Sequence, residues 1–366
     1  MKLRFPKKIL ETRIRKFQRK LSENNIDAAM IRTLSSFIYF TGTKWLRPAL
    51  LIPAEGEPTL FVARGEEEGI KERTWIQNTV TFTDGGDLMA KVSTTIRNNG
   101  YQVVGLEYGI ERDAYIIFYE MFKRLNPKTK VVDISNILYS MRMVKDIYEL
   151  EAIRRAGKIA SKVMSRITEM IEPGLSETEI AGEAYRLLYK HGSEEPLVYV
   201  NVGPHPRVHA EPFKDIVVEK GVFVNVVIGA DYNRYYANMA RTIYIGEPDG
   251  LAKKALECMQ EAYNTAIEKT RPGIRFIAVI KELDKIYRKH GLLQYRVVGY
   301  AHGVGLQIEE PPITTILPKD RFVEVKPNMT IAFIHAPLLI EGLGQVKYED
   351  TFIVKEDGHL ENVTQT

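Results

Sequence analysis

The sequence predicts two domains, an α/β domain over residues 1–138 and an α+β domain over residues 139–366. In the first, short apolar segments alternate with amphipathic ones, a pattern typical of an α/β domain with a largely buried sheet. From residue 139 to 171 the pattern changes to a long 3.6-residue periodicity without proline. A chain of 366 residues is also long for a single hydrophobic core, which favours two domains.

The first domain is expected to contain six strands and four helices. Apolar residues at helical spacing, among them Leu10, Phe17 and Leu21, predict a helix over 9–24. Short apolar runs predict strands over 26–31, 50–52, 58–62, 80–82, 103–106 and 131–132. Amphipathic segments between these runs predict helices over 66–73, 88–98 and 114–125.

The second domain is expected to begin with one continuous helix over 139–171. Ser176 followed three residues later by Glu179 predicts a capping box at the start of the next helix, over 180–191. Strands are then predicted over 197–202, 295–298, 329–334 and 346–354, and helices over 251–270 and 277–290.

A tight β-hairpin is predicted over 222–242, with Asp231 and Asn233 supplying turn residues. Period-two alternation directs every second side chain of each strand to one face, where cross-strand neighbours lie close enough to share a ligand. A pair of carboxylates on such a face could hold two metal ions about 3.5–4 Å apart. This chain has Val227 and Asn238 at the corresponding positions.

Composition argues against several classes of function. The balance of 51 Lys+Arg against 47 Asp+Glu gives a net charge of only +4, so no nucleic-acid partner is expected. No stretch of about 18 apolar residues is present, so no membrane association is expected. The single cysteine, Cys258, excludes an internal disulfide, and the start of the chain lacks a signal-peptide pattern. A cytoplasmic location is therefore expected.

Five segments of the second domain carry a recognisable order of motifs. They read Val227-Ile-Gly229-Ala230, Asn238-Met-Ala-Arg241-Thr242, His302-Gly303-Val304-Gly305-Leu306, Met329-Thr-Ile-Ala332 and Lys347-Tyr-Glu349-Asp350-Thr351. Together they resemble the pita-bread metallopeptidase family, which includes Xaa-Pro dipeptidase (prolidase), aminopeptidase P and creatinase. Residues 38–42 and 142–145 resemble the creatinase/prolidase-type N-terminal domain and its junction. The resemblance implies that residues 139–366 adopt the pita-bread fold.

The resemblance also implies where the family's five metal ligands would lie, namely at Val227, Asn238, His302, Ala332 and Glu349. Valine and alanine offer no donor atom, and asparagine offers one neutral oxygen that cannot bridge two ions as a carboxylate does. Asn225, on the same face as Val227, is a weak substitute because it is neutral. The sequence therefore predicts that the dinuclear metal site is lost and that no cofactor is bound.

Four polar residues are nevertheless expected to share a pocket: His209, His302, Glu310 and Glu349. The resemblance places His209 at a substrate-contacting position and Glu310 after the His-Gly-x-Gly motif, where Glu309 replaces a family histidine. Each histidine is equally suited to hydrogen bonding inside a packed core. Without a metal, the buried carboxylates require a nearby cation. The candidates are His209, His302, His335 and Lys347.

Three functions follow from these patterns. The first is a metal-free protein that binds a small polar or peptide-terminal ligand. The second is a metal-independent hydrolase of C–N bonds that resembles creatinase, although Ala240 stands where creatinase has a second acid. The third is an active Xaa-Pro dipeptidase with an atypical metal site, which the missing ligands disfavour. The resemblance to prolidases also implies a homodimer.

Overall fold

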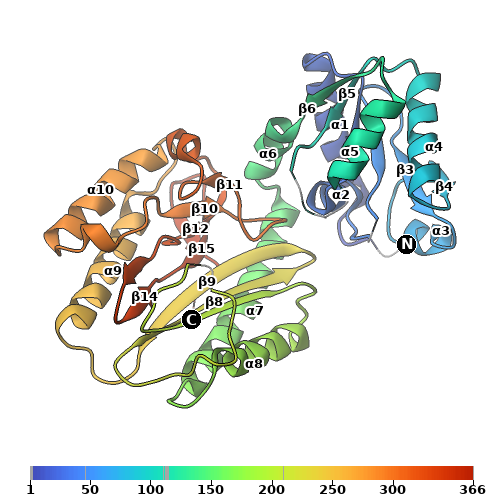
Figure 1. Ribbon diagram of the computed structural model, residues 1–366. Coiled ribbons are helices and arrows are strands. Elements are labelled where there is room, and N and C mark those ends of the chain that lie inside the picture. Colours follow the sequence, from blue (N-terminus) through green and yellow to red (C-terminus); the bar gives the residue numbers. More distant parts are fainter. Residues whose placement is uncertain (1–2, 46, 110, 112–114, 209, 366) are drawn as a thin grey trace. The chain divides into compact units, whose positions relative to one another are not determined.

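The computed structural model describes residues 3–45, 47–109, 111, 115–208 and 210–365 (Figure 1). The chain divides into two compact units, Met1–Arg142 and Met143–Thr366, referred to below as unit 1 and unit 2. Within the described residues, no helix combines the length and the apolar character needed to cross a membrane.

Unit 1 is built around a six-stranded mixed sheet with the order β4-β3-β2-β1-β5-β6. Its strands are β1 (Ala28–Ile31), β2 (Leu50–Pro53), β3 (Thr59–Ala63), β4 (Thr79–Phe82), β5 (Val103–Leu106) and β6 (Lys130–Asp133). Its helices are α1 (Lys7–Glu23), α2 (Leu34–Thr41), α3 (Glu67–Lys71), α4 (Gly85–Asn98), α5 (Tyr115–Leu125) and α6 (Ser135–Met143). The α/β class predicted for this part of the chain is confirmed, and α2 and α6 are additions to the predicted elements.

The apolar patterns of unit 1 determine its packing. Leu10, Phe17 and Leu21 are fully buried along one side of α1, as their helical spacing predicts. Phe61 of β3 and Phe122 of α5 belong to a single core that joins the sheet to α4 and α5.

Unit 2 contains two larger sheets, one with the order β7-β8-β9 and one with the order β11-β10-β12-β15-β16, and the pair β13-β14. Its strands are β7 (Leu197–Val202), β8 (Phe223–Tyr232), β9 (Tyr235–Tyr244), β10 (Ala301–Gly303), β11 (Glu310–Ile313), β12 (Thr330–Phe333), β13 (Leu338–Ile340), β14 (Gly344–Val346), β15 (Asp350–Val354) and β16 (Leu360–Asn362). Its helices are α7 (Ile147–Met170), α8 (Glu177–Lys190), α9 (Gly250–Lys269) and α10 (Phe276–Lys289).

Each of the two larger sheets of unit 2 is covered by one pair of helices (Figure 1). Helices α7 and α8 pack on the β7-β8-β9 sheet and share an apolar core with it, with Ile167 and Val200 among its members. Helices α9 and α10 pack on the larger sheet through a second core that includes Met259 and Phe333. The uncovered faces of the two sheets are therefore available to meet each other.

The two sheets of unit 2 join where β9 meets the start of β15. The Ala240 amide donates to the Glu349 carbonyl (2.9 Å), and the Glu349 amide donates to the Ala240 carbonyl (3.1 Å). The Asn238 amide donates to Thr351 Oγ1 (2.8 Å), and that hydroxyl donates to the Asn238 carbonyl (2.9 Å). These bonds hold the polar residues of both sheets along one seam.

The hairpin predicted over 222–242 is present as β8 and β9. Its turn consists of Asn233 and Arg234, which both have positive φ (53° and 71°), as a two-residue type I′ turn requires. Asp231 lies at the end of β8 rather than in the turn, and its Oδ1 accepts hydrogen bonds from the Glu194 and Glu195 amides (both 2.9 Å).

Three sequence predictions for unit 2 are wrong. Residues 139–171 do not form one helix, because the chain breaks between α6 and α7, where Asp146 caps α7. The Asp146 carboxylate accepts from the Glu149 amide (3.0 Å), and the Glu149 carboxylate accepts from the Asp146 amide (2.9 Å), which makes a capping box. The strand predicted over 295–298 is absent: Tyr295 ends a 3-10 turn that starts at Leu293, and Arg296 makes an isolated bridge to Leu338. The strand predicted over 346–354 is interrupted, because β14 ends at Val346 and β15 begins at Asp350.

Candidate functional site

The strand register brings the five family ligand positions to the seam between the sheets. His302 of β10 lies opposite Ala332 of β12, so the two side chains share a face, and Glu349 lies just before β15. In the hairpin, Val227 pairs with Ala240 and Gly229 pairs with Asn238, which puts Val227 and Asn238 on one face. The relative placement of these positions expected from the sequence is therefore present.

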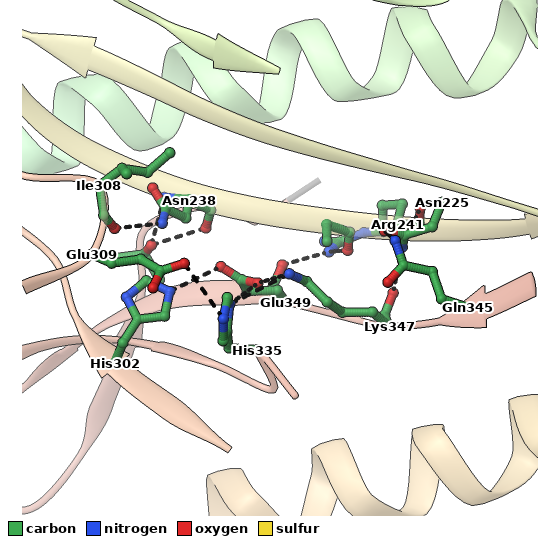
Figure 2. Close-up of polar contacts among 12 residues, drawn as sticks. Asn225, Asn238, Arg241, His302, Ile308, Glu309, His335, Gln345, Lys347 and Glu349 are labelled. Atoms are coloured by element: carbon green, nitrogen blue, oxygen red, sulfur yellow. Dashed lines mark hydrogen bonds and ion pairs between the residues drawn. The ribbon is translucent and has the colours of Figure 1, made fainter. Parts of the chain in front are cut away.

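A buried charged cluster occupies this seam (Figure 2). Glu349 is at its centre, and its Oε2 lies 2.8 Å from Lys347 Nζ and 3.2 Å from His335 Nδ1. Its Oε1 lies 3.5 Å from His302 Nε2, which is longer than a normal hydrogen bond. The side chains of these four residues are at most 5% exposed.

The cluster shifts the pKa of Glu349 and of both histidines. Burial alone would raise the pKa of Glu349, but Lys347 and the two histidines hold that pKa well below its usual range. Burial alone would lower the pKa of His302, but the Glu349 carboxylate and then Glu309 outweigh that effect and raise it. Burial, together with the Lys347 ammonium and His302, lowers the pKa of His335 to about 4. The cluster therefore contains a carboxylate and a neutral His335.

Two members of the cluster, Lys347 and His335, and the adjacent Glu309 lie outside the four residues selected from the sequence as site residues. His335 Nε2 lies 3.5 Å from Glu309 Oε1, and the rings of His335 and His302 meet edge to face with centroids 4.5 Å apart. The potential metal-binding atoms of His302, Glu309 and His335 all lie within 4.8 Å of one another. The sequence carries a signal for each of them, because Lys347 and His335 are candidate counter-cations and Glu309 stands where the family has a histidine.

Three buried atoms at the seam have no hydrogen-bond partner among the described residues: Asn238 Oδ1, His302 Nε2 and Glu349 Oε1. The rest of each side chain is held in place. Asn238 Nδ2 donates to the Ile308 carbonyl (2.7 Å), and His302 Nδ1 lies 2.8 Å from the Gly303 carbonyl. Because a buried polar atom without a partner is costly, atoms of this kind mark a place where a ligand can bind.

The other acids of the motifs are engaged in structural contacts. Glu310 Oε1 accepts from Lys145 Nζ (2.9 Å) in an ion pair that is almost completely buried. Asp350 accepts from Arg241 (3.0 Å) and from the Tyr263 hydroxyl (2.5 Å). Glu310 therefore has its own cation, distinct from the Lys347 that neutralises Glu349.

The remaining candidate positions differ in what they can contribute. Val227 and Ala332 are buried hydrocarbon side chains without a donor atom. Asn225 is committed to its neighbours, since its Nδ2 donates to Thr242 Oγ1 (2.9 Å) and its Oδ1 accepts from Gln345 (3.1 Å). The fourth predicted pocket residue, His209, lies outside the described residues.

Comparisons with known proteins identify the family of each part of the chain. Residues 13–144 match the Creatinase/Prolidase N-terminal domain, and residues 151–356 match metallopeptidase family M24. The chain is 29% identical over 358 residues to the Xaa-Pro dipeptidase of Pyrococcus furiosus, with 95% of this chain and 97% of that protein covered. It is 25% identical over 385 residues to ectoine hydrolase of Halomonas elongata, with 94% and 93% covered.

The solved structure of the prolidase from Pyrococcus horikoshii OT3 matches with a TM-score of 0.86 and 25% sequence identity. The match covers 97% of this chain and 98% of that one. The predicted family and the predicted pita-bread fold of the second domain are thereby confirmed. The chain belongs to metallopeptidase family M24 and carries a creatinase/prolidase-type N-terminal domain.

Proposed function

We propose that this chain is an Xaa-Pro dipeptidase homologue that has lost the family's dinuclear metal centre and binds a small polar or peptide-terminal ligand at the seam. The observation that supports this most directly is the set of three buried atoms without a hydrogen-bond partner among the described residues, Asn238 Oδ1, His302 Nε2 and Glu349 Oε1, of which the last two face each other at 3.5 Å. Groups on a bound ligand would satisfy them.

The residues at the five ligand positions do not fit two metal ions. Two divalent ions require several anionic oxygens and carboxylates that bridge. Val227 and Ala332 offer hydrocarbon, and Glu349 already has the Lys347 ammonium 2.8 Å away. The Lys347 ammonium therefore provides, beside Glu349, the positive charge that a metal ion would provide in a two-metal site.

The unpartnered atoms define the chemistry of the ligand. Asn238 Oδ1 and Glu349 Oε1 are acceptors, so they suit an amine, guanidinium or amide N–H. His302 Nε2, beside two carboxylates, suits a carbonyl or carboxylate oxygen when it carries a proton. A peptide terminus or an amino-acid amide offers both kinds of group. Glu309, with 21% of its side chain exposed, is the more accessible residue beside the cluster.

The creatinase-like alternative is less well supported. It requires a second acid at the position of Ala240, whose methyl group is fully buried beside the seam. One relative, ectoine hydrolase, is named for a substrate other than a dipeptide, which makes non-dipeptide ligands reasonable probes for this chain.

The proposal is tested by calorimetry in chelator with dipeptides, their amides and free amino acids. Glu349→Gln and His302→Gln are expected to weaken the binding of a hit by about tenfold or more, because each removes a charged hydrogen bond. Glu261→Gln is the matched control, since Glu261 also contacts a histidine and a lysine (both 2.8 Å), but at the surface. A hit that binds the site variants as tightly as the wild type would contradict the proposal.

Without chelator, the wild type is expected to show negligible cleavage of Ala-Pro, because bulk water without two metal ions is a poor nucleophile near pH 7. Robust cleavage that chelator abolishes would show that the third function, an atypical Xaa-Pro dipeptidase, is correct.

A further inference from the structure

His302, Glu309 and His335 form a second kind of site at the seam, one that uses only one of the family's ligand positions. They come from β10, from the segment just before β11 and from the segment after β12. Their potential ligand atoms all lie within 4.8 Å of one another. Figure 2 shows the three side chains pointing toward one another from these separate segments.

Both histidines are held as metal-bound histidines usually are. A metal-ligating histidine typically uses one ring nitrogen for the ion and donates the other N–H to a carbonyl or carboxylate, which fixes its tautomer. His302 Nδ1 lies 2.8 Å from the Gly303 carbonyl, and His335 Nδ1 lies 3.2 Å from Glu349 Oε2. His302 Nδ1 donates, because a carbonyl oxygen only accepts, so an unprotonated His302 Nε2 presents a lone pair. His335 Nδ1 also lies 3.4 Å from the Lys347 ammonium, and His335 Nε2 presents a lone pair in the tautomer in which Nδ1 donates to Glu349.

The distances suit a single ion. A tetrahedral zinc-like ion about 2.0–2.1 Å from each ligand separates its ligand atoms by roughly 3.4 Å. His335 Nε2 and Glu309 Oε1 are already 3.5 Å apart, and the edge-to-face contact of the two histidine rings, 4.5 Å between centroids, keeps His302 beside them. The three ligand atoms, which all lie within 4.8 Å of one another, would have to approach to about 3.4 Å to surround one such ion.

The charge is also appropriate for one ion. Lys347 neutralises Glu349 at 2.8 Å, which leaves Glu349 to orient His335 rather than to ligate. Two imidazoles and the Glu309 carboxylate are the donor set of many three-ligand zinc sites that keep a fourth position open, and His302 must release its Nε2 proton when the ion binds. Glu309 is partly exposed, so solvent or a ligand can reach that position.

We propose that His302 Nε2, His335 Nε2 and the Glu309 carboxylate bind one transition-metal dication, with Zn²⁺ and Co²⁺ as the best matches to this donor set. The site goes beyond the proposed ligand binding and does not rest on it. Because His302 belongs to both, ligand binding is measured in chelator and metal binding is measured without ligand.

The test titrates the metal-depleted full chain with Zn²⁺ by calorimetry and with Co²⁺ by visible absorption. We expect one equivalent of either ion, with the intense cobalt band of a low-symmetry tetrahedral site. His335→Ala and Glu309→Gln are each expected to weaken binding by about tenfold or more, since each removes one of three ligands. His290→Ala is the matched control, because His290 Nε2 lies 2.8 Å from Glu261 in a histidine–carboxylate pair outside the cluster.

The outcomes separate the alternatives. Two equivalents that persist in His335→Ala and Glu309→Gln would overturn this site in favour of the family's two-metal centre. Binding that is lost in His290→Ala, or the absence of binding by the wild type, would also overturn it. Melting curves of the apo variants confirm that each remains folded, so a loss of metal binding in a folded variant supports the site.

Discussion

At the scale of single residues, Lys347 explains how Glu349 can remain a buried carboxylate at the centre of the charged cluster. Glu349 is 1% exposed, and a buried carboxylate without a partner is strongly destabilising. Lys347 Nζ lies 2.8 Å from Glu349 Oε2 and is itself only 4% exposed, so the pair is desolvated together. Removing one partner should therefore cost far more than removing a member of a surface pair.

Lys347→Met is expected to lower the free energy of unfolding by about 3–5 kcal/mol, because it leaves the Glu349 charge buried beside two histidines. The measurement is urea denaturation at neutral pH. Lys285→Met is the matched control, since Lys285 also lies 2.8 Å from a glutamate, Glu282, but with its side chain 66% exposed. That change should stay within about 0.5 kcal/mol.

A second variant distinguishes lost charge from lost packing. Lys347→Met combined with Glu349→Gln removes both charges and should recover part of the stability that Lys347→Met loses. If the double variant is as unstable as the sum of the two single variants, the pairing of these two residues does not account for the effect.

At the scale of elements, Gly305 allows the loop between β10 and β11 to close over a buried ion pair. A Cβ at this position would lie 2.4 Å from Glu310 Oε1 and 3.2 Å from Lys145 Cε. Distances this short require Glu310 to move away from Lys145. Position 305 therefore requires a residue without a Cβ, so that the Glu310 side chain can lie close to the backbone there.

Gly305→Ala is expected to destabilise the protein by about 2–3 kcal/mol, through crowding and disturbance of the Lys145–Glu310 pair. Gly182→Ala is the matched control: Gly182 lies in α8, and a Cβ there would meet no atom within 4 Å. That change should stabilise α8 by about 0.5–1 kcal/mol, because alanine favours helix. Thermal or urea unfolding measures both, and equal effects would contradict the role given to Gly305.

At the scale of the whole molecule, the family's two-metal centre depends on both sheets of unit 2. Val227 and Asn238 belong to the hairpin, Ala332 belongs to β12, and the hydrogen bonds between Ala240 and Glu349 hold the two sheets together. Ligands restored on one sheet alone would not complete the set.

The combined variant Val227→Asp, Asn238→Asp and Ala332→Glu is expected to bind about two equivalents of Mn²⁺, more than any of the single variants, because bridging carboxylates act together. Without metal it should be less stable than the wild type, since three added carboxylates would be buried without cations. Elemental analysis and melting curves with and without metal check both parts. Full metal uptake by Val227→Asp alone would contradict this account.

The sequence by itself determined the family, the pita-bread fold and most elements. Each of the five motifs is a short run of consecutive residues, so it can be read directly from the sequence. The turn at Asn233 can be predicted in the same way, because a hairpin turn depends on residues a few positions apart. The predicted helix over 139–171 overlooks the break before α7. Asp146 and Glu149 have the spacing of a capping box, but the helical periodicity of apolar residues continues across the break.

Tertiary structure alone decided which acid meets which cation. Glu310 pairs with Lys145, which is 165 residues away in the sequence, and Glu349 pairs with Lys347 rather than depending only on the histidines. It also brought His335 and Glu309 to His302. The charge and donor atoms of a side chain are properties of the residue, but its partner depends on strand register and on how two sheets meet, and these are set by packing over the whole unit.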